Sequence, residues 1–443
     1  MSSFPTLWRR LVDGFWFVPG AIAISLSLLA FLALEADRRL EVDGLAFAFG
    51  GDADAARNVL STIAGSLITV AGLTFSITIV VLTLVSSQYT PRAVRGFLAD
   101  RLNQAVAGAF VGIFAYCLIV LGAVRSEEAA FRFVPVVSVS VSLLLGLTAL
   151  ALLVVFVHHM GQNIQASNIA ARIGRETLRA VERLYPEQFG EPRGEDPGAT
   201  VERWRSDEEP GVVTGTRAGF VQRISIEGIK GCLETRPLRV HVPVTPGEFV
   251  TPETRLVEVW PRASVDRGSA DRVRAQVTIG SERDVRQDAA YGFRQLADIA
   301  LKALSPGVND PTTAVEALGH SIAGLERLAR RSIPSAVRRG TDEQVGLVVA
   351  QADFASFVET ALGEIAHYAA ANPRVVIEAL NGLARVADAA EQVGADERLE
   401  ILATMAEEIA AHARDAAETQ RERERVDDAL RRVSAGSRAA SNG

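Results

Sequence analysis

Long apolar segments alternate with short polar connections over the first 157 residues. A helix needs about 20 residues to cross a bilayer. Four segments reach that length, at residues 17–34, 59–85, 104–124 and 134–157. No Asp, Glu, Lys, Arg or His stands in the middle of any of them. The pattern therefore predicts a transmembrane domain of four helices over residues 1–157.

The flanks of these segments indicate an orientation. Arg9 and Arg10 precede the first segment, and no small-residue cleavage site follows it, so we interpret it as a retained span rather than a signal peptide. Arginines are modestly more frequent at the N-terminus, in the second loop and after the fourth span. This bias predicts a multi-pass protein of the bacterial inner (plasma) membrane with both termini in the cytoplasm.

Hydroxyl side chains recur along the second segment at steps of three, four or seven, which places them on one helical face. They are Thr62, Ser66, Thr69, Ser76 and Thr83, and we call this set the hydroxyl stripe. Small and hydroxyl residues are typical of packed membrane helices, whereas a polar stripe is also typical of a helix that lines a narrow path. Both interpretations require neighbouring helices, including those of other subunits, so we expect a homo-oligomer.

The period of the hydrophobic pattern changes twice after the fourth span. Residues 158–210 read as an exit helix and a polar linker. Residues 211–280 contain short β-rich runs with a period of two, which predict a small β domain, either a barrel or a sandwich. The fold class is thus four transmembrane helices followed by a cytoplasmic α+β region.

Helical periodicity returns in residues 281–432 and predicts a cytoplasmic helical domain. Its last three helical patterns cover residues 343–371, 374–393 and 396–432, and short connections between them predict antiparallel packing. The final residues, 433–443, have the composition of a disordered tail.

Composition and motifs argue against several functional classes. The chain has 443 residues and a formal net charge of −7, which gives no reason to expect a nucleic-acid partner. Its two cysteines are too few for a disulfide framework or a cysteine-based zinc site, and they agree with a cytoplasmic location. The sequence has no phosphate-binding loop, HExxH motif or GxSxG motif. We therefore predict no metal, no cofactor and no enzymatic activity.

The sequence SPGVNDP, residues 305–311, is the densest turn signal in the chain. Asp310 can cap the following helix with Pro311 at its first position, which makes the segment a corner between two helices. The other interpretation is a cytoplasmic binding site for a small anionic ligand, because arginine suits anions. Its candidate residues are Arg286, Asp288, Arg294, Ser305, Asn309 and Asp310.

Three stretches resemble a family of predicted bacterial inner-membrane proteins that contain a domain of unknown function. They are TFSITIVVLTLVSSQYTPRAVRGFLAD (74–100), RDVRQDAAYGFRQLADIALKALSPGVNDPTTA (283–314) and, more weakly, GFVQRISIEG (219–228). In that family the loop typically reads Ser-Pro-Gly-Ile-Asn-Asp-Pro, and Val308 replaces the isoleucine here. The resemblance covers most of residues 5–390. It implies N-terminal spans followed by a soluble C-terminal region, and it implies no activity.

These observations favour an oligomeric, channel-like conduit for ions or small solutes, lined by the second span and regulated by the cytoplasmic domain. The alternative is a membrane-anchored sensor or scaffold that binds a ligand or partner through the cytoplasmic domain. An enzyme using Asp288, Asp310 and Ser305 is the third and least favoured hypothesis, because the sequence pairs no nucleophile with a base.

Overall fold

The computed structural model describes residues 16–39, 49–88, 100–125, 133–163, 165–185, 196–233, 238–339 and 345–439. The chain divides into two compact units, Met1–Asn168 and Ile169–Gly443. We call them the membrane unit and the C-terminal unit, and each is described by itself.

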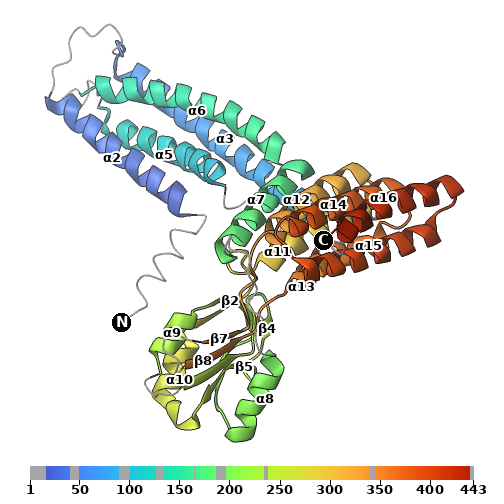
Figure 1. Ribbon diagram of the computed structural model, residues 1–443. Helices are drawn as coiled ribbons and strands as arrows, with labels where there is room; N and C mark the ends of the chain where they lie inside the picture. Colours follow the sequence, from blue (N-terminus) through green and yellow to red (C-terminus); the bar gives the residue numbers. More distant parts are fainter. Residues whose placement is uncertain are drawn as a thin grey trace. The chain divides into compact units, whose positions relative to one another are not determined.

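The membrane unit contains the predicted spans (Figure 1). Its helices in the described residues are α2 (Phe17–Arg39), α3 (Ala53–Gln88), α5 (Arg101–Ala123) and α6 (Val136–Asn163). All 4 are long and apolar enough to cross a membrane, which confirms the prediction. Helix α5 packs against the other three. At Gly112 of α5, a Cβ atom would lie 2.7 Å from Cδ1 of Leu26 in α2, so the missing side chain permits a close approach.

Polar side chains of the membrane unit join the helices at their ends. The Asp37 carboxylate accepts hydrogen bonds from the backbone N of Val137 (2.7 Å) and of Ser138 (2.9 Å), and so caps the start of α6. At the opposite end of α6, Nε2 of His159 lies 2.7 Å from Oδ2 of Asp100, the residue that caps α5. These contacts of Asp37, Asp100 and His159 lie near the helix ends, outside the apolar middle of the spans, as expected for a bilayer.

The C-terminal unit starts within α7 (Ala166–Leu184), and α8 (Pro197–Asp207) follows. Residues 186–195 of the predicted linker lie outside the described residues. Two sheets follow. The 5-stranded sheet has the order β1-β5-β3-β8-β7, and the 3-stranded sheet has the order β4-β2-β6. The strands are β1 (Gly211–Thr214), β2 (Gly219–Ile224), β3 (Leu238–Val242), β4 (Phe249–Val250), β5 (Arg255–Trp260), β6 (Val277–Gly280), β7 (Val337–Arg339) and β8 (Val345–Val349).

Both sheets contribute to one hydrophobic core. Val240 and Val257 of the larger sheet and Val221 of the smaller one belong to the same buried cluster. The short helices α9 (Ile226–Gly231) and α10 (Arg267–Arg274) cover it with Ile229 and Val273. Within the described residues the sheets stay open, so the barrel alternative is wrong and two facing sheets are found.

Strand β8 corrects the predicted helix over residues 343–371. It is an inner strand of the larger sheet, between β3, to which it is parallel, and β7, to which it is antiparallel. Leu347 and Val349 enter the core between the sheets, whereas Val348 packs on the other face against Trp204 and Trp260. A strand buried on both faces has a continuous apolar run instead of an alternating one, and such a run cannot be told from helix by its period.

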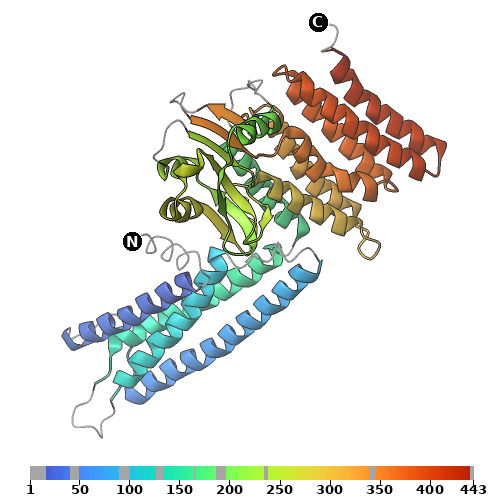
Figure 2. The ribbon, with the colours of Figure 1, turned by 90° about the horizontal axis from the view of Figure 1, so that it is seen from below.

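The remaining α-helices of the C-terminal unit pack side by side (Figure 1 and Figure 2). They are α11 (Ala289–Leu304), α12 (Pro311–Ala329), α13 (Phe354–Tyr368), α14 (Pro373–Glu391), α15 (Asp396–Ala416) and α16 (Gln420–Ala439). Helix α7 belongs to the same packed group. A Cβ atom at Gly292 of α11 would collide with Oγ1 of Thr177, and at Gly174 it would lie 2.9 Å from the His320 side chain of α12.

The single helix predicted over residues 396–432 is two helices, α15 and α16. The backbone N of Thr419 donates to the Glu422 carboxylate (3.1 Å), and the backbone N of Glu422 donates to Oγ1 of Thr419 (3.3 Å). This reciprocal pair is a capping box, which starts a new helix. Helix α16 continues to Ala439, into the segment predicted as a tail, and residues 440–443 lie outside the described residues.

Candidate ligand-binding site

The structure does not bring the six predicted cytoplasmic site residues together. Arg286 and Asp288 precede α11, and Ser305, Asn309 and Asp310 follow it. Helix α11 has 16 residues, so its two ends are about 24 Å apart. The sixth residue, Arg294, lies within the helix.

Both predicted arginines have acidic partners in the structure. Nε of Arg286 lies 3.0 Å from the Asp284 carboxylate, and Nε of Arg294 lies 3.0 Å from that of Asp298. Arg294 also pairs with Glu364 of α13. Since these carboxylates neutralise the two guanidinium groups, the arginines give little support to the anionic ligand predicted for them.

The loop from Ser305 to Pro311 is built as a helix corner. The Asp310 carboxylate accepts from the backbone N of Thr312 (3.1 Å) and of Thr313 (3.2 Å) and from Oγ1 of Thr313 (2.6 Å). These hydrogen bonds, that of the Thr313 side chain above all, lower the pKa of Asp310. Asn309 has φ 47°, the left-handed conformation that ends the preceding turn. The predicted cap of α12 by Asp310 and Pro311 is thus confirmed.

The hydroxyl stripe faces away from the other spans of the same chain. Thr62, Ser66, Thr69, Ser76 and Thr83 are all exposed in the isolated chain. The opposite face of α3 packs inward through residues such as Leu60, Leu67 and Val81. Oγ1 of Thr69 donates to the carbonyl oxygen of Gly65 (3.1 Å), a bond within the helix. The five hydroxyl side chains are therefore not packed against the other described spans of this chain.

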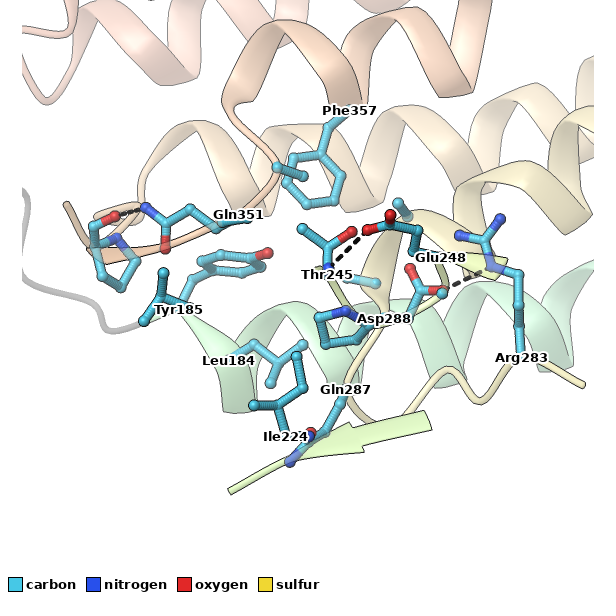
Figure 3. Close-up of a pocket in the computed structure, with 18 of the residues that line it drawn as sticks. Leu184, Tyr185, Ile224, Thr245, Glu248, Arg283, Gln287, Asp288, Gln351 and Phe357 are labelled. Carbon is cyan, nitrogen blue, oxygen red and sulfur yellow. Dashed lines mark hydrogen bonds and ion pairs between the residues drawn. The ribbon is translucent and has the colours of Figure 1, made fainter. Parts of the chain in front are cut away.

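A cavity of about 510 Å³ lies in the C-terminal unit where the two sheets meet the helices. We call it the pocket (Figure 3). Its walls come from the end of α7, the turn between β3 and β4, the start of α11, the segment after β8, and α13. The side chains used below are Tyr185, Glu248, Arg283, Asp288 and Phe357. Of the six predicted residues only Asp288 lines the pocket.

Asp288 is buried at the base of α11. Its Oδ1 accepts from the backbone N of Tyr291 (3.0 Å), which caps the helix, and its Oδ2 accepts from Nε of Arg283 (2.8 Å). Burial raises the pKa of Asp288, and the ion pair with Arg283 opposes that rise. A buried acid with a raised pKa beside a cavity is typical of binding and catalytic sites.

Gly247 allows the β3–β4 turn to lie directly on this ion pair. Its φ of +92° is open to glycine and strained for other residues. A Cβ atom there would collide with Oδ2 of Asp288 and lie 2.9 Å from Nε of Arg283. The glycine therefore brings the turn, with Thr245 and Glu248, to the edge of the pocket.

Aromatic side chains form the wall opposite this turn. The rings of Tyr185 and Phe357 meet edge to face, with centroids 5.7 Å apart. Figure 3 shows the Tyr185 hydroxyl directed toward Thr245 and Glu248. Burial and the nearby charge of Asp288 both raise the pKa of Tyr185, so the phenol stays neutral and can donate a hydrogen bond.

The comparisons with known proteins agree with this architecture. The family model described as "Predicted membrane protein (DUF2254)" matches residues 13–385. The chain belongs to this family. The predicted resemblance is thereby confirmed, and the matched region includes all four spans and every residue that lines the pocket.

Relatives of the chain occur in mycobacteria. It is 32% identical over 343 residues to the uncharacterised protein Mb1321c of Mycobacterium bovis and, to the same extent, to the uncharacterised protein Rv1290c of Mycobacterium tuberculosis. The alignments cover 76% of this chain and 65% of each relative, so the chain spans about two thirds of their length. No solved structure matches the chain.

Only one of the residues that line the pocket, Asp288, is predicted from the sequence. Tyr185, Glu248 and Phe357 are far apart along the chain and carry no shared motif. The available signal was the Pro246–Gly247 turn, which indicates a special backbone conformation without showing what it contacts.

Proposed function

We propose that this membrane protein is a sensor whose C-terminal unit binds a small molecule in the pocket. The observation that carries the proposal is the pocket itself. Its volume of about 510 Å³ falls in the range of small-molecule sites, about 300–1,000 Å³. Its largely apolar wall and few convergent polar groups are also typical of such sites.

The chain offers a route from the pocket to the membrane. Leu184 and Tyr185, at the end of α7, contribute to the pocket wall. NH1 of Arg331 holds this end by donating to the carbonyl oxygens of Glu182 and Tyr185. The fourth span, α6, ends at Asn163 and α7 starts at Ala166. A ligand that contacts α7 would therefore act on the helix that follows this span directly in the chain.

Binding is favoured over catalysis by the positions of the acidic residues. Asp310 and Ser305 lie at the far end of α11 from Asp288, so the three residues of the enzyme hypothesis do not share a site. Asp288 is already engaged by Arg283 and the backbone N of Tyr291. We propose these contacts as elements of a binding site.

The test is a thermal-shift screen of the full chain in lipid nanodiscs against a library of water-soluble metabolites. At least one compound should raise the melting temperature. Ala290→Phe, which places a ring in the pocket wall, should abolish the shift. Ala411→Phe, at an exposed helix position, is the matched control and should retain it. A shift that survives Ala290→Phe, or no shift with any compound, would reject the pocket as the sensor site.

A conduit is the second candidate, and the hydroxyl stripe is the observation that favours it. Five hydroxyl residues on the exposed face of α3 are available to meet the same face of other subunits. In a ring of such helices the stripes would line a polar path. Under this proposal the protein is a homo-oligomer in the bacterial inner membrane, with its C-terminal unit in the cytoplasm.

The conduit is tested by the subunit number in nanodiscs and by conductance in planar bilayers. Ser76→Val, on the stripe, should lower conductance without changing assembly. Thr78→Val is the control, because Thr78 lies on the opposite, partly buried face of α3, where its Oγ1 donates to the carbonyl oxygen of Thr74 (2.8 Å). A monomer, or equal conductance of both variants and the wild type, would exclude the path.

A further inference from the structure

We infer that the ligand of the pocket is a small organic cation, an amine with an apolar body, and this inference rests on the proposed binding function. It differs from the anionic ligand that the arginines in the sequence suggest. Three observations support the organic cation: the charge balance of the pocket wall, the contacts that already engage its arginine, and the position of Glu248.

The described residues of the pocket wall include three charged side chains, Glu248, Arg283 and Asp288. With all three ionised, their formal charges sum to −1. If Asp288 is protonated, the sum is zero. The wall therefore has no net positive charge in either state, and it cannot attract an anion through its total charge.

Arg283, the basic residue of the wall, already has two partners. Its Nε donates to Oδ2 of Asp288 (2.8 Å). Its guanidinium carbon lies 5.0 Å from the centre of the Tyr291 ring, a cation–π contact. An anion bound at the terminal nitrogens of Arg283 would share its single positive charge with Asp288, and displacing Asp288 would leave a buried carboxylate unpaired, which is costly.

Glu248 supplies the charge that remains once the Arg283–Asp288 pair is set aside. Its Oε2 accepts from the backbone N of Thr245 (3.0 Å), which holds the carboxylate against the turn at the edge of the pocket. Figure 3 shows this carboxylate on the side toward which the Tyr185 hydroxyl points. A carboxylate and a phenol oxygen are acceptors, as the donors of an ammonium group require.

The rest of the wall fits the apolar body of such an amine. Tyr185 and Phe357 present aromatic rings, whose faces attract cations and whose apolar surface packs against hydrocarbon groups. Leu184, Ile226 and Val349 add aliphatic surface. A primary ammonium at Glu248 with an aromatic or branched body among these residues would satisfy both parts of the wall.

The test compares three probes with the same body and different charge, 2-phenylethylammonium, 2-phenylethanol and 3-phenylpropionate, on the full chain in nanodiscs of zwitterionic lipid at neutral pH. Calorimetry should show the ammonium binding about tenfold more tightly than the alcohol, the size expected for one partly exposed charge pair. The carboxylate should bind most weakly. Glu248→Gln should remove the preference for the ammonium, whereas Glu253→Gln, an exposed acid in the next turn, should retain it.

The possible failures can be told apart. If the alcohol or the carboxylate binds as tightly as the ammonium, and Ala290→Phe abolishes that binding, the pocket is a ligand site and the cation assignment is wrong. An ammonium preference that persists in Glu248→Gln also overturns the assignment. If none of the probes binds, the cation assignment is rejected, and the metabolite screen decides separately whether the pocket binds any ligand.

Discussion

Two buried acids in the C-terminal unit have opposite environments. Glu258, on β5, is fully buried and has three basic partners. It lies 2.7 Å from NH2 of Arg205, 3.0 Å from NH1 of Arg255 and 2.9 Å from Nδ1 of His241. Asp288 has one basic partner, Arg283, and lies beside the pocket.

Their pKa values move in opposite directions. Burial raises the pKa of Glu258, but the hydrogen bonds from His241, Arg205 and Arg255 together outweigh burial, and the net effect is a lowered pKa. At Asp288 burial outweighs the single ion pair, and the pKa rises. The Glu258 cluster ties α8 to the larger sheet through Arg205, and we interpret it as structural. Asp288 lies next to a cavity, and its single basic partner stabilises the ionised carboxylate less than the three partners of Glu258 do. The following experiments challenge that distinction.

The largest effect is expected for Glu258→Gln. The variant leaves three basic groups around a position that no longer carries charge, and breaking a buried ion pair from one side costs about 3–5 kcal/mol. The free energy of unfolding, measured by denaturant titration of the full chain, should fall by that amount. Glu227→Gln is the control, because Glu227 is exposed and pairs only with Lys230 in the same short helix. A loss in Glu258→Gln no larger than in this control would contradict a structural role.

Gly247→Ala should have the next largest effect. The new Cβ would require a strained φ and would collide with Oδ2 of Asp288. Strain of this kind costs about 1–3 kcal/mol, and displacement of the turn should also weaken ligand binding in the pocket. Gly231→Ala is the control, because no atom lies within 4 Å of its Cβ position. Unchanged stability and binding in Gly247→Ala would show that the turn does not depend on this close approach.

Asp310→Ala should lower the free energy of unfolding by about 1 kcal/mol, the usual value of a helix N-cap. Asp310→Asn should recover most of the loss, since asparagine is also a good cap. Ligand binding in the pocket should not change in either variant, because the SPGVNDP corner is at the other end of α11. If a stable Asp310→Ala protein loses ligand binding, the loop is a functional site and more than a helix corner.

The smallest effect is the pH dependence, and its sign separates the two acids. A lowered pKa means that Glu258 contributes stability above its ordinary pKa, and that this contribution is lost as the pH falls through the folded-state value. Asp288, with a raised pKa, contributes most below its ordinary value and less as the pH rises through its folded-state pKa.

Melting temperatures should therefore be compared with non-titrating variants between about pH 3 and pH 7, a range that extends below the ordinary pKa of glutamate and above that of aspartate. The wild type should gain stability relative to Glu258→Gln as the pH rises, and it should lose stability relative to Asp288→Asn. The same sign for both comparisons would show that the two environments are not opposite.

Much of the fold could be predicted because its signals are local. The four spans follow from uninterrupted apolar length, and the helix corner follows from Asp310 and Pro311, whose capping depends on residues two and three positions away. Where the prediction was wrong, the deciding contacts were distant. Val348 packs against Trp204 and Trp260, which no period within residues 343–371 could indicate.

The sequence by itself determined the apolar spans, the opposite faces of α3 and the caps of the helices, because hydropathy, periodicity and capping depend on neighbours within a few residues. Only the tertiary structure decided that β8 joins the larger sheet and that Tyr185, Glu248 and Asp288 surround one pocket. It also decided that Arg286 and Arg294 are neutralised by nearby acids. Burial and ion pairing depend on which distant segments meet, and that information is distributed over the whole chain.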